Sequence, residues 1–518
     1  MALAQAGQKV LVCEQHEVAG GWTHSFTLDG YRFSTGVHYI GELGEGGRLR
    51  DIYEGLGVSE DIEFLELNPD GIDHIFIGDE QFDIPKNKDR LIRRLKQRFP
   101  HEAEGIEKYF KTAAGLYEIV KRLVDYKPIN SNFHLLPWLL RTGADLIERY
   151  VSDPTLRAIL ATQAGDHGMP LSKVSAAVHA SIPMHYAGGA YYPRGGSANS
   201  RALTRALKRA GGEIRLSTPV GRILMESRRA VGVALLDGEE VRAQYILSNA
   251  DPETTFIKLI GREHLPWRLK RKVERVSYST SCLSLFLVIA MDLKAMGFDS
   301  GNYWFYEHAD IESVYEQGLG DAILHQPPDV LFLTVTTLKD PSKMHSGHHT
   351  VEVFAFVSYE PFAEWAHEPT GDRSWEYQQL KEELSGRIIS VLERRIPGIT
   401  ESVVLSELGT PLSNEHYLNS HQGNIYGIAK GVWQAGPLAF RTKPGIKNLY
   451  LCGQSTMSHG IAETANSGII AACKILKCRK ADLLAQGGPP LKIYPSDDLS
   501  QWPEPLQKSI ALKRKKHG

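Results

Sequence analysis

Apolar residues follow two spacings along the chain. Four runs rich in apolar residues have the length of buried strands: Val10–Cys13, Leu283–Ala290, Val330–Thr337 and Val351–Ser358. Elsewhere apolar residues recur every three or four positions, as at Leu91, Leu95 and Phe99. Runs of the first kind are typical of strands that are buried on both faces, and the second spacing is typical of amphipathic helices. The mixture of the two predicts an α/β fold.

Turn and capping residues set several boundaries. Ile72–Ile77 and Gln81–Ile84 flank the turn residues Gly78 and Asp79, which predicts a hairpin. The zone from Lys86 to about Tyr150 is helical in character. Asp153 precedes a proline at the first helical position and predicts a helix that runs to Gly165. Two more helices are predicted at Ser172–Ile182 and Trp375–Arg395.

One apolar segment has two interpretations. Phe133–Leu140 is strongly apolar and is bounded by polar residues. It is either a buried helix or an interfacial helix that lies on a membrane or lines the access route of a lipid-like substrate.

The start of the chain carries the first chemical signal. The apolar residues before Gly7 predict the end of a helix, and the run Val10–Cys13 ends in Glu14. Such an arrangement matches the second half of a dinucleotide-binding βαβ unit, in which the carboxylate at the strand end accepts hydrogen bonds from a ribose. An ordinary helix–strand pair of an α/β domain gives the same pattern.

Two further motifs favour the first interpretation. Gly20 and Gly21 follow Glu14, and a glycine pair lets the backbone approach a flat ligand closely. Near the other end, the strand Leu449–Cys452 leads through Gly453 to a small-residue helix that opens at Gly460. The positive end of a helix dipole stabilises negative charge on a ligand placed there.

Together these motifs resemble the retinol saturase and carotenoid isomerase branch of the phytoene desaturase superfamily. The similarity covers roughly Val10 to Leu476 and includes the string from Thr35 to Leu43, the segment 189–197 and the turn 409–412. It implies non-covalently bound FAD and a hydrophobic substrate. The implied cofactor contacts are Glu14, Gln15, Gly20, Gly21, Thr23, His24, Gly36, Val220, Gly453, Gly460 and Ile461.

The resemblance also implies a domain plan. The fold is a discontinuous, Rossmann-like FAD-binding domain of the glutathione reductase type with an inserted α+β substrate domain. The FAD-binding parts are residues 1–85, 186–265 and 435–478, with a helical substrate or lid region at 86–185, a substrate domain with an antiparallel sheet at 266–434, and a flexible tail at 479–518.

The glycine-rich turn that holds a pyrophosphate is missing from the sequence. It should lie about 20 residues before the ribose carboxylate, and no G-x-G-x-x-G occurs ahead of Glu14. The interpretation is that Met1 lies inside the first helix of the unit. The chain would then be truncated or read from a mis-assigned start, and its first strand would be absent.

Composition narrows the function classes. At 518 residues the chain predicts two or more domains. A net charge of −2 gives no electrostatic reason to expect nucleic acid. Five cysteines without a C-x-x-C pair favour a reducing, cytoplasmic location and argue against a structural metal. Two short segments each have two interpretations. The cluster of His345, His348 and His349 is either a metal site or a solvated loop. The basic run Lys513–Lys516 either contacts anionic lipid or is solvated.

The predicted function is that of an FAD-dependent oxidoreductase, peripheral to a membrane, that saturates or desaturates a retinoid- or carotenoid-like isoprenoid. His38 and His459 are the titratable side chains predicted nearest the flavin, either as catalytic groups or as packing partners. The alternatives are a redox-neutral carotenoid isomerase that uses reduced FAD and an inactive truncated flavoprotein. An amine oxidase is disfavoured, because nothing resembles the aromatic cage of that family.

Overall fold

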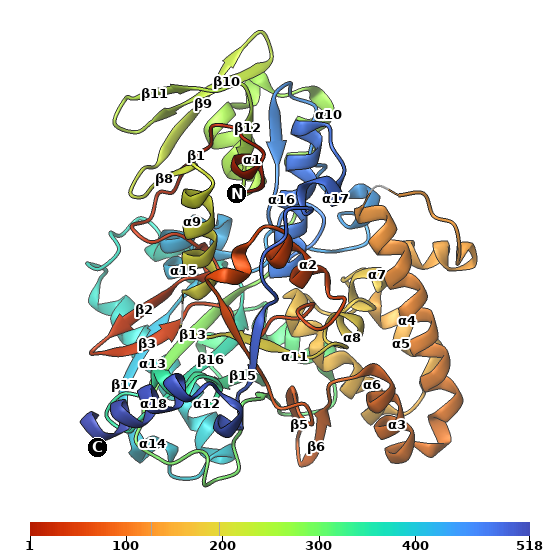
Figure 1. Cartoon of the computed structure of the whole chain (residues 1–518). Helices are drawn as coiled ribbons and strands as arrows, with labels where there is room; N and C mark the ends of the chain where they lie inside the picture. Colours follow the sequence, from red (N-terminus) through yellow and green to blue (C-terminus); the bar gives the residue numbers. More distant parts are fainter. Residues whose placement is uncertain (126, 196, 518) are drawn as a thin grey trace.

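The protein is described by a computed structural model that covers residues 1–125, 127–195 and 197–517. Figure 1 shows a large sheet in the lower half of the molecule, a group of helices beside it, and smaller sheets above. Among these residues no helix combines the length and the hydropathy needed to cross a lipid bilayer.

The largest element is a seven-stranded sheet in the order β17-β13-β16-β15-β14-β5-β6. All neighbours are antiparallel except β14 and β5. Its strands are β5 (Asp73–Ile77), β6 (Glu80–Ile84), β13 (Ser281–Ile289), β14 (Asn302–Tyr306), β15 (Val330–Val335), β16 (His349–Val357) and β17 (Val403–Gly409). The predicted hairpin and the three long apolar runs are confirmed. The hairpin β5–β6 adds two strands to this sheet, although residues 1–85 were predicted to belong to the FAD-binding domain.

The two faces of this sheet have different neighbours. On β13, Leu283, Leu285 and Leu287 point to one face and pack against helix α13 (Trp375–Arg395). Cys282 points to the opposite face, which packs against the helices of the middle region. Alternation along the strands therefore gives the sheet one purely structural face and one face that is available to line a cavity.

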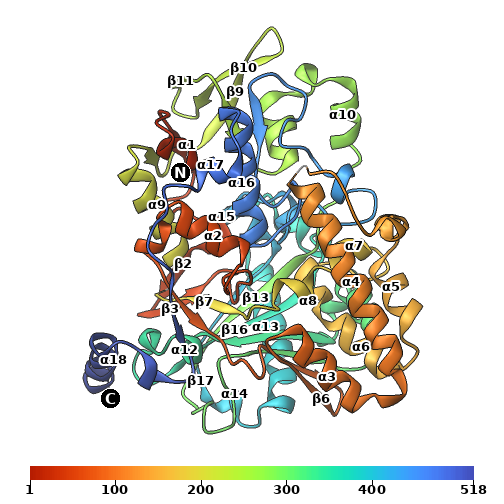
Figure 2. The ribbon, with the colours of Figure 1, turned by 45° about the vertical axis from the view of Figure 1, so that its right-hand side comes forward.

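The middle region is helical, as predicted, and stands at the right of Figure 2. Its helices are α3 (Lys88–Arg98), α4 (Ala103–Val124), α5 (Gly143–Tyr150), α6 (Pro154–Ala161), α7 (Ala176–His179) and α8 (Ile182–His185). The Asp153 side chain accepts a hydrogen bond from the Leu156 N–H, so the predicted cap of α6 is confirmed.

Two predictions in this region are wrong in their details. Phe133–Leu140 forms 3₁₀ turns, not a buried α-helix, because Pro137 interrupts it and only Leu135 is buried. Ser172–Ile182 is not one helix: only Ala176–His179 forms a regular α-helical turn, and the last residue, Ile182, begins α8. The backbone N–H of Ser175 instead donates to the Lys430 carbonyl, which holds this residue in an extended conformation.

Small sheets built from distant segments occupy the upper half. β1 (Leu11–Cys13) pairs in parallel with β8 (Glu213–Arg215), and β12 (Ile246–Ser248) pairs in parallel with β18 (Leu449–Leu451). The other strands are β9 (Val220–Glu226), β10 (Arg229–Leu235) and β11 (Glu240–Arg242), with the separate hairpin β2 (Ser25–Leu28) and β3 (Tyr31–Ser34). The helices beside these strands are α1 (Ala2–Gln5), α2 (Arg48–Gly55), α9 (Ala198–Arg209) and α16 (Ile461–Leu476).

The C-terminal segment, which we predicted as a flexible tail, contains regular structure. β19 (Lys492–Pro495) pairs in parallel with β4 (Glu63–Glu66), and β4 pairs on its other side with β7 (Tyr191–Pro193). The segment is held because Leu491 is buried in an apolar core. Helices α17 (Lys480–Leu483) and α18 (Glu504–His517) flank the strand. The side chains of Lys513–Lys516 lie outside the described part of the chain, as does Gly196.

The remaining elements join these parts. They are α10 (Trp267–Val273), α11 (Ile311–Gly318), α12 (Thr336–Lys339), α14 (Ile399–Ser402) and α15 (Pro411–Leu418).

Candidate functional site

A single cavity of about 2370 Å³ runs between the small sheets and the large one. Nearly all residues that the sequence predicted for cofactor or catalysis line it. They are Glu14, Gln15, Gly20, Gly21, Thr23, His24, Gly36, His38, Val220, His459, Gly460 and Ile461. Gly453 is the exception: a side chain at this position would overlap Asn249, so its glycine is required by packing at the end of β18.

One end of the cavity is built by the chain that leaves β1. The Glu14 N–H donates to the Arg215 carbonyl at 2.9 Å, which extends the pairing of β1 and β8 to the carboxylate. The Glu14 side chain turns back and accepts the His16 N–H at 2.9 Å. Val220 begins β9 on the same wall. This end therefore presents a carboxylate acceptor beside an apolar surface, as an adenosine requires.

The glycine pair is needed where the backbone turns past helix α9. Gly20 has a φ of +131°, and a Cβ on it would lie 2.8 Å from the Ser200 Cβ. Thr23 Oγ1 donates to the Gly20 carbonyl at 2.9 Å, and the His24 ring donates to the Gly21 carbonyl. Close packing here keeps the loop against α9 while one side of it faces the cavity.

The N-terminus of α16 points into the middle of the cavity wall. Gly460 has a φ of +82°, and no atom lies within 4 Å of where its Cβ would be. The carbonyl of Gly460 accepts the Thr464 N–H at 2.9 Å and so begins the helix. The 16-residue helix places its partial positive charge at this open position.

Buried polar atoms without partners mark the same space. Six described side chains that line the cavity have such atoms: Trp22 Nε1, Arg48 Nε, Asn199 Nδ2, Thr254 Oγ1, His459 Nδ1 and both ring nitrogens of His167. Buried polar groups are nearly always hydrogen-bonded in native proteins. With the Glu14 acceptor and the α16 N-terminus, these groups fit a ligand that carries ribose, phosphate and ring polar atoms. The residues present therefore fit FAD.

The far end of the cavity is apolar and aromatic. Trp304, Phe332 and Phe354 are register partners on three adjacent strands and form a row across the sheet. The ring centres of Trp304 and Phe332 are 4.8 Å apart, and those of Phe332 and Phe354 are 6.1 Å apart. Phe356 and Cys282 extend this floor. We refer to Trp304, Phe332, Phe354 and Phe356 as the aromatic floor.

His38 is held by a buried hydrogen-bond partner. Its Nε2 donates to the Glu352 carboxylate at 2.7 Å, and Glu352 also accepts the Ser34 N–H at 2.7 Å. The buried ammonium of Lys339 donates to the His38 carbonyl. Burial lowers the pKa of His38 although Glu352 opposes this shift. The ring therefore has a fixed orientation on the cavity wall, and its catalytic or packing role stays a prediction.

Asp166 was not predicted from the sequence, because an aspartate in a short Ala-Gly-Asp-His segment follows no pattern. It lines the cavity, and its carboxyl oxygens accept the Tyr39 hydroxyl at 2.9 and 3.0 Å. The Tyr39 ring is stacked on Tyr186 at 4.7 Å with an angle of 5°. Burial and the nearby charge of Asp73 raise the pKa of Asp166 to about 8.

His459 lies beside Asp166. Its Nε2 donates to the Asp166 carbonyl at 2.6 Å, and burial lowers its pKa to about 3. Burial also lowers the pKa of Lys430, a neighbour of His459, to about 7 and that of His185 to about 4. The cavity wall between α16 and the aromatic floor is therefore largely uncharged near neutral pH, which suits an apolar ligand.

The histidine cluster offers no metal site within the part of the chain that the structure describes. These residues contain no group of three or more side chains placed to hold a metal ion. His349 is buried in β16 and bonds Thr337, while His348 bonds the Tyr31 hydroxyl at 2.8 Å.

Comparison with known sequences agrees with the motifs. Residues 1–476 match the model of the flavin-containing amine oxidoreductases. The chain is 29% identical over 511 residues to the all-trans-retinol 13,14-reductase of Danio rerio, covering 92% of this chain and 83% of that protein. It is 27% identical over 505 residues to the chloroplastic prolycopene isomerase of Daucus carota, covering 91% and 77%. The resemblance inferred from the motifs is confirmed.

Comparison with solved structures supports the fold. An oxidoreductase from Methanosarcina mazei superposes with a TM-score of 0.61 at 16% identity, covering 92% of this chain and 96% of that one. At this identity the likeness concerns the mixed α/β architecture alone.

Proposed function

Because the chain belongs to the flavin-containing amine oxidoreductase family and is an FAD-dependent oxidoreductase, we propose that it saturates or desaturates a carbon–carbon double bond of a retinoid- or carotenoid-like isoprenoid. When bound, FAD supplies hydride transfer at its N5 position. The protein binds both molecules, holds them in register and excludes water.

The proposed cofactor site unites three segments of the chain. β1 pairs with β8, and β12 pairs with β18, so residues from 1–85, 186–265 and 435–478 meet in parallel sheets. This pairing supports the proposed discontinuous FAD-binding domain. In it, Glu14 accepts the ribose hydroxyls, Val220 contacts the adenine, and the N-terminus of α16 faces the flavin ring.

The aromatic floor carries the substrate proposal. A row of aromatic rings, packed edge to face at 60–69° and continuous with the cofactor-lining part of one cavity, offers an apolar surface along a conjugated chain. The neighbouring polar groups are hydrogen-bonded to the protein or uncharged, so they impose little desolvation cost on an apolar ligand. The relatives named above act on a retinol and a carotenoid, which are molecules of this kind.

We place the access route of the substrate beside the 3₁₀ segment Phe133–Leu140. Leu139 lines the cavity, whereas Phe133 and Leu140 are 58% and 61% exposed. Exposed apolar side chains at the mouth of an apolar cavity suit a peripheral contact with a lipid surface. Replacing Phe133 and Leu140 by serine should weaken co-sedimentation with neutral phosphatidylcholine vesicles. The free energy of unfolding should change by less than about 0.5 kcal/mol, because surface positions contribute little.

Product mass provides the test of the reaction. The FAD-loaded protein, reduced under anaerobic conditions, is incubated with all-trans-retinol and separately with a poly-cis carotene. A gain of two hydrogens is the expected result for saturation, and the oxidised protein should give a loss of two with a desaturable polyene. If neither substrate is converted and no polyene quenches the protein fluorescence, the proposal is wrong.

A redox-neutral isomerase is the second candidate. It is favoured by the similarity to a prolycopene isomerase, and the same cavity would serve it. A product of unchanged mass but altered retention, formed only by the reduced protein, would support this candidate over the first.

A further inference from the structure

Three side chains meet where the two halves of the cavity join. Asp166 belongs to the 3₁₀ segment Thr162–His167, Tyr39 follows β3, and Tyr186 follows α8. All three line the cavity, and the Tyr39 hydroxyl bridges both carboxyl oxygens of Asp166. The hydrogen bonds between Tyr39 and Asp166 join side chains from separate segments and are not part of the backbone bonding of a strand or helix.

The position of this group relates it to both ligands. The backbone carbonyl of Asp166 accepts His459 Nε2, the residue next to Gly460 at the start of α16. On the other side, the Tyr39 ring lies 6.3 Å from Phe332 of the aromatic floor. Asp166 and Tyr39 therefore lie between the wall assigned to the flavin and the floor assigned to the substrate.

We infer that Asp166 is the acid that supplies a proton to the substrate carbon, with the Tyr39 hydroxyl as its relay. The inference rests on the proposed function. Tyr39 can accept the Asp166 proton while it releases its own, because a hydroxyl is both donor and acceptor.

The atoms and electrons of saturation balance with this group in place. Adding hydrogen across one double bond takes a hydride at one carbon and a proton at the next. The hydride brings both electrons and comes from reduced FAD, which an external two-electron reductant must regenerate. The π electrons of the double bond form the second C–H bond, and Asp166 is left as a carboxylate that water reprotonates. In desaturation Asp166 runs in reverse, as the base.

The surroundings keep this carboxyl protonated near neutral pH. The titratable side chains around it are Tyr39, Tyr186, Tyr306, Tyr315, Tyr426, His459, Asp73 and His167. The histidines among them have lowered pKa values and so bring no compensating positive charge. Burial and the negative charge of Asp73 raise the pKa of Asp166 to about 8, into the range that suits general acid catalysis at pH 7.

Other carboxylates on the cavity wall are held by donors. Glu463 is paired with Arg48, and Asp251 accepts the Ser455 hydroxyl, the His421 N–H and the Asn424 amide. Burial raises the pKa of Glu463 as well, but the Arg48 guanidinium holds its carboxylate in place. Asp166 differs because its hydrogen-bonded side-chain partner is the phenol of Tyr39, with no ionic or amide donor on its carboxyl group among the described residues.

The first test reads the proton without any turnover. Infrared spectra of the FAD-loaded wild type are compared with those of Asp166→Asn. A carboxylic acid C=O band that shifts in D₂O should be present at pH 7, should disappear with a midpoint near pH 8, and should be missing in the variant. Asp79→Asn, an exposed position in the β5–β6 turn, is the matched control and should keep the band. Absence of the band in the wild type at pH 7 overturns the inference.

The second test reads the reaction. Asp166→Asn should bind FAD and polyene as the wild type does and lower single-turnover product formation by roughly 100-fold or more. Tyr39→Phe should keep the acid band and lower the rate by at least about 10-fold. Tyr109→Phe, which removes a buried hydroxyl in α4 away from the cavity, should leave the rate unchanged. A wild-type rate in Asp166→Asn overturns the inference alone, whereas a wild type that converts no isoprenoid overturns the proposed function.

Discussion

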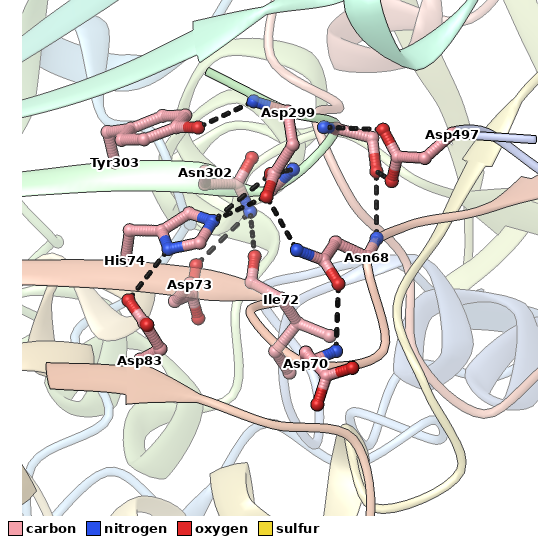
Figure 3. Close-up of polar contacts among 12 residues, drawn as sticks. Asn68, Asp70, Ile72, Asp73, His74, Asp83, Asp299, Asn302, Tyr303 and Asp497 are labelled. Carbon is pink, nitrogen blue, oxygen red and sulfur yellow. Dashed lines mark hydrogen bonds and ion pairs between the residues drawn. The ribbon is translucent and has the colours of Figure 1, made fainter. Parts of the chain in front are cut away.

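Two histidines of this protein, the buried His74 and the half-buried His459, have opposite surroundings. His74 on β5 donates through Nδ1 to Asp83 at 2.7 Å and through Nε2 to Asp299 at 3.1 Å (Figure 3). His459 on the cavity wall donates through Nε2 to a backbone carbonyl, and its Nδ1 has no partner among the described residues. The two carboxylates raise the pKa of His74 to about 9, while burial lowers that of His459 to about 3.

This difference in hydrogen bonding distinguishes side chains that stabilise the fold from side chains that we assign to ligand binding. Around His74, Asp299 also accepts the Asn68 amide (Figure 3). Asp299 accepts the Gly301 N–H as well, and Asp497 accepts the Ser300 hydroxyl. This His74 cluster satisfies its own hydrogen bonds. Around His459, several polar atoms of cavity-lining side chains have no hydrogen-bond partner among the described residues, which is uncommon for buried groups. Changes to the cluster should therefore alter stability, and changes to the cavity should alter binding.

The largest effect is expected at Glu14, on the cavity side. If its carboxylate accepts two ribose hydroxyls, Glu14→Leu should weaken FAD binding by about 3 kcal/mol, or roughly 100-fold, because charge-assisted bonds are lost. Glu14→Gln should weaken it less, and FMN, which lacks the adenosine half, should bind each protein equally. Flavin titrations with unfolding curves measure both properties. If the free energy of unfolding falls as much as the FAD affinity, Glu14 stabilises the fold, as the His74 cluster does.

A smaller effect is expected from Asp299→Asn in the cluster. The amide keeps the shape but removes one charge beside protonated His74, and we expect the free energy of unfolding to fall by about 2 kcal/mol. FAD affinity should not change, since the His74 cluster does not line the cavity within the described part of the chain. Reduced flavin content in the folded variant would contradict the separation.

The smallest effect is the pH dependence of stability. The raised pKa of His74 means that its contribution is complete below about pH 6.5 and is lost as pH rises through about 9. Asp83 is partly exposed, so screening reduces the expected loss to about 1–2 kcal/mol. Urea unfolding at pH 6.5 and 9.5 measures it. His74→Gln should lack this slope, and an equal slope in that variant would assign it to other groups.

The sequence correctly predicted those helices and strands whose formation depends on residues close together in the chain. The helix Trp375–Arg395 and the hairpin at 72–84 follow from apolar spacing and turn residues, and the Asp153 cap follows from its neighbour Pro154. Prediction from the sequence failed where the structure of a segment depends on residues far away in the chain. β19 forms because β4 is available some 430 positions earlier, and Phe133–Leu140 stays exposed because the surrounding helices leave it uncovered.

The candidate site divides in the same way. Residues next to glycine turns, such as Gly20 and Gly460, were predicted to share one site, and the structure brings them to one cavity. Their roles remain predictions. Asp166 and the aromatic floor could not be predicted, because no spacing within the sequence places Asp166 beside Tyr39 or aligns residues of three strands in register.

The joining of distant segments also bears on how the protein is made. The cavity is walled by residues near the start of the chain, such as Val10, and by residues of α16, such as Ile475. A ribosome adds about 5–20 residues per second, so the aromatic floor emerges on the order of ten seconds before α16 completes the cavity wall. FAD uptake is therefore expected only after α16 has been synthesised.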